Sequence, residues 1–333
     1  GVRRYIVRET FGPAEQLTPI PGSVLYDPAG LALRNPAELF IANRAAHTGK
    51  SSIARVSLFG SNFSYIDSFS GNGVTDCHQL NFDPVSGELF QTNWSSGVLS
   101  RFLFDASGNP VPNGTILMPD SGKQLGVVVR PADRQLFVSD YTKVRRFMPN
   151  PDGSYTFLGY FAINNSTQYH FMKVKDDLLY LTSFSENAVI RFSFDAQGNP
   201  TEKDRIVASN ALDMDFSPDG QEMFVTDHGN GGIMRFRYDS ITETWIRNGD
   251  DIPTPMLGGI VIVPTACPLS ADLTGECIVD LEDLRIFASQ WLVPGDDYYC
   301  MMGGNLVGDK CLVTLEDFAE FVAQWMMKYP PDE

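Results

Sequence analysis

An internal repeat is the feature that most constrains the fold of this chain. Each of five copies holds a β-prone stretch that runs from an aromatic residue to an Asn, Asp or Ser, and a loop then leads to an apolar residue and an Arg. The aromatic positions lie 43–50 residues apart, at Phe40, Phe90, Phe137, Tyr180 and Phe224. Gly, Pro, Asn and Asp turns separate the short strands, and no helical period interrupts them before residue 264. Four short strands at such a period are typical of a β-propeller.

The flanks of the repeats predict one further blade. Residues 257–264 look like an innermost strand, and residues 4–9 look like an outer one. A blade built from both ends of the chain would remove the open sheet edges. We therefore predict a mainly β fold, a six-bladed β-propeller over residues 1–264 with five clear repeats and a sixth blade closed by both ends.

The repeated polar positions are predicted to be structural. The side chains that end the second strand, as in Asn43 and Asp140, should hold the following turn. The repeated arginines should bridge neighbouring strands or blades, and these are Arg55, Arg101, Arg146, Arg191 and Arg235. Cys77 is predicted to be a buried thiol that acts as a small apolar residue.

Chemistry is expected instead where a residue departs from the repeat. Aligning the copies places one residue per blade at the same level near a channel mouth, namely Gly30, His78, Leu125, His170, Leu212 and Gly258. Gln79 and Asp213 follow one step later. Two imidazoles at this level could bind a metal or act as acid and base, or they could simply line a wet channel. No residue is assigned as catalytic, and His78, His170 and Asp213 are the candidates.

The repeat pattern resembles the superfamily of propellers that includes NHL-repeat proteins and lactonase-type propellers. The related gluconolactonases hold a catalytic divalent ion at the channel mouth with a Glu, an Asn and an Asp. This sequence has no such set at the matching level, which argues against that activity. Trp94 and Tyr141 follow second strands and could stack on sugars, or could pack within their loops.

The composition changes after Pro264, and this change marks a predicted boundary between domains 1–264 and 265–333. The last 69 residues hold 13 of the 41 acidic side chains, 3 of the 25 basic ones and four of the five cysteines. The formal net charge of the chain is −16, which argues against nucleic-acid binding. No run of 18 apolar residues is present, so no membrane span is predicted.

The second domain is duplicated. Residues 281–291 and 315–325 are identical at six of eleven positions, and their apolar residues recur at helical spacing. Each predicted helix should pack its Phe and Trp side chains on its twin. A loop of oxygen-bearing residues precedes each helix, at spacings with which EF-hand loops bind Ca²⁺.

The duplicated loop and helix closely resemble the dockerin family, and in particular the dockerin-like tails of planctomycete-type bacteria. The resemblance implies a small α domain of two calcium loop–helix repeats that docks onto a partner. It assigns a first Ca²⁺ to Asp272, Thr274, Glu276, the Ile278 carbonyl, Asp280 and Asp283. The second loop keeps Asn305, Asp309 and Asp317, but Lys310 would repel a cation. One Ca²⁺ is therefore expected, with a second as an option.

The four C-terminal cysteines sit at matching places in the two repeats. The economical pairing is Cys267 with Cys277 and Cys300 with Cys311; pairing across the repeats and a zinc site remain alternatives. Disulfides in a small domain indicate an oxidising compartment. The protein is therefore predicted to be secreted, extracellular or on the cell surface.

Two functions follow from these observations. The first is a non-enzymatic interaction protein, in which the propeller is a platform and the Ca²⁺-stabilised domain binds a protein partner or other copies of the chain, for self-assembly or surface attachment. The alternative is a secreted propeller enzyme acting on a polysaccharide or lactone, or a sugar-binding propeller, anchored by the same domain.

Overall fold

The computed structural model describes residues 27–35, 38–44, 51–58, 64–120, 122–164, 167–254, 258–263 and 315–325, together with residues 3–4, 15–16, 25, 284 and 287–288. The chain divides into two compact units, one carrying the repeats and the other the C-terminal residues from 264 onward. Each unit is described by itself below.

The repeats form five antiparallel sheets of four strands, each ordered as in the chain. The first sheet is β3 (Pro28–Asn35), β4 (Glu38–Asn43), β5 (Ser52–Ser57) and β6 (Ser64–Phe69). The second is β7 (Cys77–Phe82), β8 (Leu89–Asn93), β9 (Val98–Phe104) and β10 (Pro110–Leu117). The third is β11 (Val127–Val129), β12 (Leu136–Ser139), β13 (Val144–Pro149) and β14 (Tyr155–Phe161). The fourth is β15 (Tyr169–Lys175), β16 (Leu178–Ser183), β17 (Ala188–Phe194) and β18 (Pro200–Val207). The fifth is β19 (Ala211–Phe216), β20 (Glu222–Asp227), β21 (Ile233–Asp239) and β22 (Thr244–Arg247).

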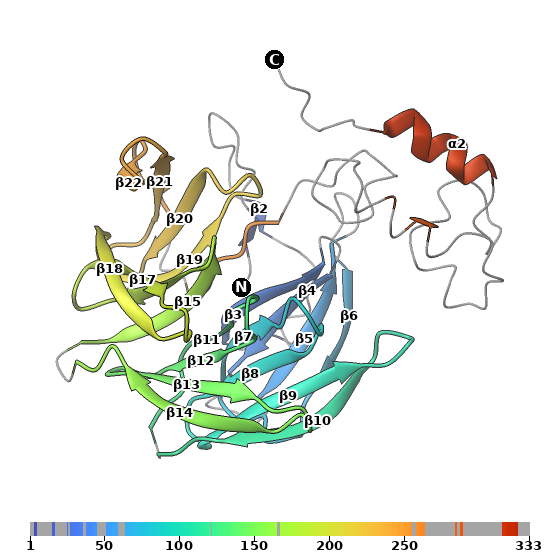
Figure 1. Cartoon of the computed structure of the whole chain (residues 1–333), viewed down its shortest axis with the longest axis horizontal. Coiled ribbons are helices and arrows are strands. Elements are labelled where there is room, and N and C mark those ends of the chain that lie inside the picture. The colour runs from blue at the N-terminus through green and yellow to red at the C-terminus, as the bar shows by residue number, and fades with distance from the viewer. Residues whose placement is uncertain are drawn as a thin grey trace. The chain divides into compact units, whose positions relative to one another are not determined.

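The sheets are the blades of a propeller. The first strand of each sheet lies toward the centre and the fourth toward the outside (Figure 1), and successive first strands contact one another from β3 to β19. The repeated aromatic anchors are buried between the blades, and Phe40, Phe90 and Phe137 have no exposed surface. Each blade thus contributes one buried aromatic anchor, and the length of one blade sets the period of the repeat in the sequence. The predicted mainly β propeller is confirmed, with five blades in the described part of the chain.

Hydroxyl groups of the second strands tie the blades together. Thr92 Oγ1 accepts the N–H of Gln79 in its own blade at 2.8 Å and donates to the Leu125 carbonyl of the next blade at 2.9 Å. Ser139 and Thr182 make the equivalent bridges to the fourth and fifth blades. One edge of an innermost strand has no neighbouring strand in its own sheet, so its backbone N–H and C=O groups need other partners. The hydroxyl bridges supply some of these partners.

The repeated polar residues have the structural roles predicted for them. Arg101 pairs with Glu88 at 2.7 Å and donates to the Gly153 carbonyl of the next blade at 2.9 Å, and Arg146 reaches Gly198 in the same manner at 3.0 Å. The turn-holding role is equally clear, since Asp140 accepts the N–H groups of Thr142 and Lys143. Cys77 is a buried free thiol, and burial raises its pKa to about 12.

Residues 258–263 lie between the fifth and the first blade. Asp213 and Asp215 of β19 accept the N–H groups of Ile260 and Ile262 at 2.9 and 2.7 Å. The side chains of Ile260 and Ile262 pack against a fifth-blade cluster, whereas Val261 packs against a first-blade cluster. We call residues 258–263 the closing segment. At the other end of the chain, β1 (Arg3–Arg4) pairs with β2 (Glu15–Gln16), and residues 5–9 of the predicted sixth blade lie outside the described residues.

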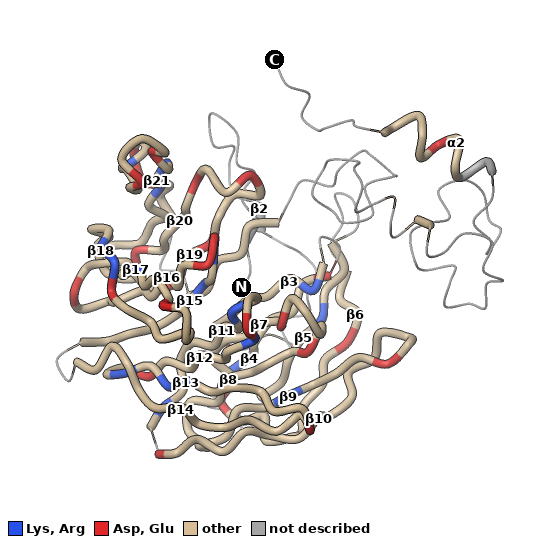
Figure 2. The backbone as a smooth tube through the Cα atoms, in the orientation of Figure 1, with Lys and Arg blue, Asp and Glu red and all other residues tan. Residues whose placement is uncertain are grey.

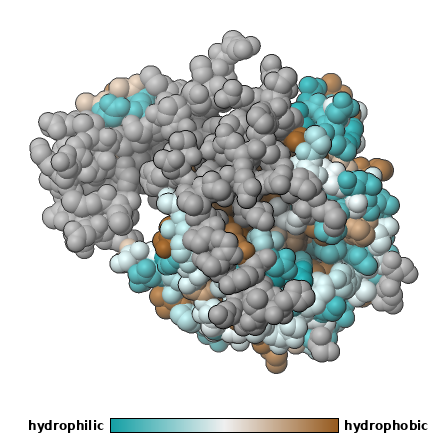
Figure 3. All heavy atoms as spheres, turned by 180° about the vertical axis from the view of Figure 1, so that it is seen from behind, coloured by the Kyte–Doolittle hydropathy of each residue, from teal (hydrophilic) through white to brown (hydrophobic). Residues whose placement is uncertain are grey.

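Charged and apolar residues are spread over the described blades. Figure 2 shows Lys and Arg positions interspersed with Asp and Glu positions along the strands. Apolar residues on the face in Figure 3 are scattered among hydrophilic ones. Within the described residues there is therefore no basic stripe of the kind that nucleic acids require. None of the described helices is long and apolar enough to cross a membrane.

The C-terminal unit holds the helix α2 (Leu315–Gln324), where the second copy of the duplication predicts one. Phe321 of this helix is 1% exposed, and its ring centroid lies 5.0 Å from that of Phe287, which is also 1% exposed. Phe287 and Phe321 occupy the same position of the duplicated segment, so matching residues of the two copies are in contact. The predicted calcium ligands from Asp272 to Asp309, the Asp317 side chain and the four cysteines lie outside the described residues.

Candidate functional site

One residue of each blade lies just beyond the second strand, at the same end of the propeller, and we call this end the mouth. This residue follows the Asn, Asp or Ser that ends the second strand, and all five examples are half-buried. We call the five residues the mouth ring, and they are Arg44, Trp94, Tyr141, Phe184 and His228.

The mouth ring is nearly continuous in aromatic contact. The Arg44 guanidinium lies 5.6 Å from the Trp94 ring centroid, and Trp94 meets Tyr141 edge to face at 5.4 Å. His170 fills the gap between the third and fourth blades, with its ring 5.8 Å from Tyr141 and 6.2 Å from Phe184. Phe184 then reaches His228 at 6.1 Å. Aromatic side chains therefore line the mouth from the second blade to the fifth.

The two candidate histidines are both part of this site. His78 is 6% exposed, and its imidazole is stacked on Trp94 with ring centroids 5.3 Å apart and an interplanar angle of 21°. His170 is 8% exposed. The Phe171 ring, next to His170, meets the His78 ring edge to face with centroids 5.4 Å apart, so side chains from the innermost strands of the second and fourth blades meet here. In the described part of the chain, Nδ1 of each imidazole has no hydrogen-bond partner.

Burial keeps both imidazoles neutral. Loss of water lowers the pKa of His78 to about 3, and the nearby charges of His170 and Arg44 act in the same direction. Burial likewise lowers the pKa of His170 to about 4, with His228 adding to the effect. A neutral imidazole has one nitrogen that donates and one that accepts. No described hydrogen bond reaches Nδ1 of either ring, so each Nδ1 is open to a hydrogen bond with a hydroxyl group.

Asp213, the third candidate, has a different role. Its carboxylate accepts the N–H groups of Ile260 and Met214, and burial raises its pKa to about 7 against the opposing charge of Lys173. Lys173 itself lies 3.2 Å from Asp215. Asp213 thus belongs to a polar group that holds the closing segment, and no described hydrogen bond or ion pair joins it to His78 or His170. Gln79 is engaged similarly, because its Oε1 accepts the Val127 N–H at 2.7 Å.

One predicted alignment was wrong by a residue. Pro28 pairs with Asn43 as Cys77 pairs with Asn93, so Ala29, and not Gly30, is level with His78. The bulge between Pro28 and Leu31 has a counterpart in β7, but β3 has a second register shift between Leu33 and Asn35 that the sequence does not reveal. Gly30 instead lies where a Cβ would come within 2.6 Å of the His78 carbonyl oxygen. Its small size therefore lets the first blade approach the strand that carries His78.

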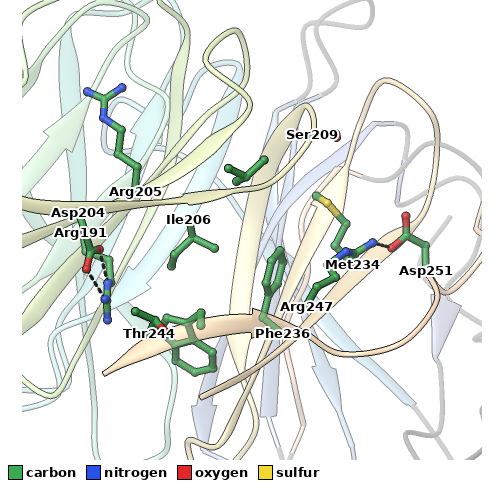
Figure 4. A pocket seen from close by; sticks show the side chains of 12 residues that line it. Arg191, Asp204, Arg205, Ile206, Ser209, Met234, Phe236, Thr244, Arg247 and Asp251 are labelled. Carbon is green, nitrogen blue, oxygen red and sulfur yellow. Dashed lines mark hydrogen bonds and ion pairs between the residues drawn. The ribbon is translucent and has the colours of Figure 1, made fainter. Parts of the chain in front are cut away.

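A separate pocket of about 540 Å³ lies between the fourth and fifth blades (Figure 4). Ile206, Met234 and Phe236 supply apolar walls. Its charges compensate one another, since Arg191 pairs with Asp204 and Arg247 with Asp251. Every charged side chain that lines this pocket has an ion-pair partner. The mouth is therefore the stronger candidate for a functional site.

The sequence analysis singled out His78, His170, Trp94 and Tyr141. It did not assign the other three residues of the mouth ring, which are Arg44, Phe184 and His228. The sequence could have revealed these three residues, because each of them directly follows the Asn, Asp or Ser that recurs in every copy of the repeat. No group of three or more His, Cys, Asp or Glu side chains that could hold a metal occurs among the described residues. The predicted calcium ligands fall outside them.

Comparison with known proteins places the fold. No family model matches the chain, and no curated protein matches it significantly. A candidate 6-phosphogluconolactonase from Bacteroides fragilis is 17% identical, with a TM-score of 0.59 over 76% of this chain and 78% of that one. A periplasmic gluconolactonase from Pseudomonas aeruginosa is 13% identical, with a TM-score of 0.56 over 70% and 72%. A chain of a nidogen–laminin complex is 14% identical, with a TM-score of 0.55 over 78% and 94%. At these identities the likeness establishes a β-propeller and no particular activity.

Proposed function

We propose that the propeller mouth binds a cyclic carbohydrate or a sugar lactone. The observation that carries this proposal is the pair of buried, neutral imidazoles, His78 and His170, whose free Nδ1 atoms lie beside Trp94 and Tyr141. A few polar groups set among aromatic side chains are typical of small-ligand sites. A buried polar atom without a partner costs roughly 1–3 kcal/mol, so a ligand hydroxyl that forms a hydrogen bond with Nδ1 is favoured.

The chemistry of the mouth suits a sugar better than a fully charged or fully apolar ligand. Aromatic rings offer flat apolar surface to the C–H groups of a pyranose, while neutral imidazoles accept from its hydroxyls. The two gluconolactonase-type neighbours support this ligand class, and the neighbour from a nidogen–laminin complex supports a binding role. Carbohydrate recognition is therefore favoured over a purely structural platform.

Lactone hydrolysis is the second candidate. One neutral imidazole would take a proton from the water that attacks the lactone carbonyl carbon, and the ring C–O bond would break as the alkoxide receives a proton. The names of the neighbours favour this reaction. However, a base whose pKa is about 3 or 4 takes up a proton weakly, so the histidines support binding better than rapid turnover.

Calorimetric titration of the whole chain with D-glucono-1,5-lactone and with cellotriose tests the proposal. We expect binding of at least one ligand, and Tyr141→Ala should weaken it about tenfold. Tyr160→Ala is the matched control, because Tyr160 lies on the outer strand β14. Release of acid from the lactone, followed in the same samples, tests hydrolysis. Absence of binding, or equal binding by both variants, would overturn the proposed site.

The C-terminal unit, residues 265–333, is proposed to bind one Ca²⁺ through the first loop, and a second where Asn305, Asp309 and Asp317 suffice. The packing of Phe287 on Phe321 supports the duplication on which this proposal rests. Disulfides Cys267–Cys277 and Cys300–Cys311 and attachment to a partner protein or another copy of the chain belong to the same proposal. A Ca²⁺ titration followed by mass determination with and without chelator tests the ion and the association together.

The sixth blade and the location of the protein are also proposals. The closing segment supports a sixth blade, because Asp213 and Asp215 hold it as Gln79 and Asn81 hold β11. A periplasmic neighbour and the clustered cysteines support a protein outside the cytoplasm. Thiol counting on protein purified from the exported fraction tests the second point.

A further inference from the structure

Lys123 stands apart from the other described lysines. Lys143, Lys173 and Lys203 each lie within 3.4 Å of an Asp or Glu oxygen, and Lys175 pairs with Asp176. Lys123 is exposed and has no carboxylate partner in the described part of the chain. In a chain with a net charge of −16, an unpaired lysine is an exception that calls for a reason.

The place of this lysine is the propeller mouth. Its Nζ lies 4.2 Å from the ring centroid of Trp94 and 5.4 Å from that of Tyr141. An ammonium over aromatic faces is attracted by them, but its charge is not neutralised. Arg44 also lies beside Trp94, yet Asp27 and Asp76 compensate its charge at 3.3 and 3.5 Å. Among the described residues, Lys123 is therefore the positive charge on the aromatic part of the mouth that has no carboxylate partner.

We infer that Lys123 is the subsite for the carboxylate of an acidic sugar, a uronate, bound in the mouth. This inference rests on the proposed function of the mouth as a carbohydrate site. A lysine ammonium is a compact point charge that matches one monovalent anion, whereas a phosphate dianion would need further donors. The sugar ring would contact Tyr141, and its exocyclic C6 carboxylate would meet the Lys123 ammonium, which lies over the Trp94 and Tyr141 rings.

Trigalacturonate and its fully methyl-esterified form test the inference, because the ester keeps the rings and removes the charges. We expect the acid to bind the whole chain at least tenfold more tightly than the ester, and this preference should shrink as salt is raised. Lys123→Met should abolish the preference, and Lys123→Arg should retain most of it. Lys203→Met is the matched control, since it removes the same charge from β18 on the outside of the fourth blade.

The outcomes separate the two proposals. Equal binding of acid and ester, unchanged by Lys123→Met, would overturn the uronate subsite and leave the carbohydrate site standing. If Lys203→Met weakens the preference for the acid as much as Lys123→Met does, the preference arises from the overall charge of the protein. That result would also overturn the uronate subsite. If neither trisaccharide binds at millimolar concentration, and the lactone and cellotriose do not bind either, the carbohydrate site itself is wrong.

Discussion

The Asp213 carboxylate accepts the backbone N–H of Ile260 across 2.9 Å, although 47 residues separate them in the chain. Asp215 does the same for Ile262. Equivalent bonds between the second and third blades use the amides of Gln79 and Asn81. The link between the fifth blade and the closing segment is therefore titratable where its counterpart is not.

This difference predicts how Asp213→Asn changes the pH dependence of stability. Burial raises the pKa of Asp213 to about 7 from 3.8, so the native state loses stability as pH rises from about 4 to 7. The asparagine keeps an acceptor for the Ile260 N–H and removes the buried charge. We expect the variant to gain roughly 1–4 kcal/mol relative to the wild type between pH 4 and pH 8. Urea unfolding at both pH values measures the gain, and an equal difference at the two values would contradict it.

The two mouth histidines act in the opposite direction. Their pKa values fall from 6.5 to about 3 and about 4, so they stabilise the native state above pH 6.5 and this stability is lost as pH falls. Each contributes a slope of about 1.4 kcal/mol per pH unit between the two pKa values. His78→Gln with His170→Gln should therefore flatten or reverse the acid loss of stability between pH 6.5 and 4. An unchanged slope in the double variant would show that the imidazoles are not buried as described.

Gly30→Ala should be costly although it adds one methyl group. The new Cβ would lie 2.6 Å from the His78 carbonyl oxygen and 2.7 Å from Gln79 Cα, both backbone atoms. The first and second blades would have to move apart, and overpacking of this kind costs about 1–3 kcal/mol. Gly87→Ala is a poor control because Gly87 has a left-handed backbone conformation. Ser57→Ala, at the last residue of β5, is a better control. Unfolding midpoints of the two variants measure the difference, and equal midpoints would contradict the close approach.

The packing of the duplicated C-terminal segments can be tested in the same way. Phe287 and Phe321 are each 1% exposed, so replacing either by Ala should cost roughly 3–5 kcal/mol of the stability of this unit. Phe318 is 41% exposed, and Phe318→Ala should cost less. Because the two buried rings touch, the double variant Phe287→Ala with Phe321→Ala should cost less than the sum of the single changes. Additive costs would mean that the rings do not share one core.

Ligand binding should require the His170 imidazole, and the affinity should not change with pH above pH 6. Burial holds the pKa of this imidazole at about 4, so it remains a neutral acceptor throughout that range. We expect the affinity for the lactone or cellotriose to be constant from pH 6 to 8 and to fall as pH approaches 4. His170→Asn, which moves the acceptor, should weaken binding about tenfold from pH 6 to 8. An affinity that rises steeply between pH 6 and 8 would contradict a neutral His170.

The sequence by itself determined the blades and much of the mouth. One aromatic anchor per copy must be buried, and turn residues separate strands of fixed length, so the period alone predicts five four-stranded sheets and the innermost strands on which His78 and His170 lie. The packing of Phe287 on Phe321 could be predicted for the same reason, because a duplicated apolar stripe needs a matching surface. These are consequences of local pattern and burial.

The tertiary structure alone decided which of these residues meet. A register shift peculiar to β3, between Leu33 and Asn35, leaves no trace in the pattern, so Ala29 and not Gly30 is level with His78. The mouth ring joins residues from five copies that are about 45 positions apart, and only the packing of the second blade beside the third brings Lys123 over Trp94 and Tyr141. Burial then sets the charge state of His78, His170 and Asp213, because the pKa of a group depends on the water and charges that surround it, and these are properties of the packed propeller.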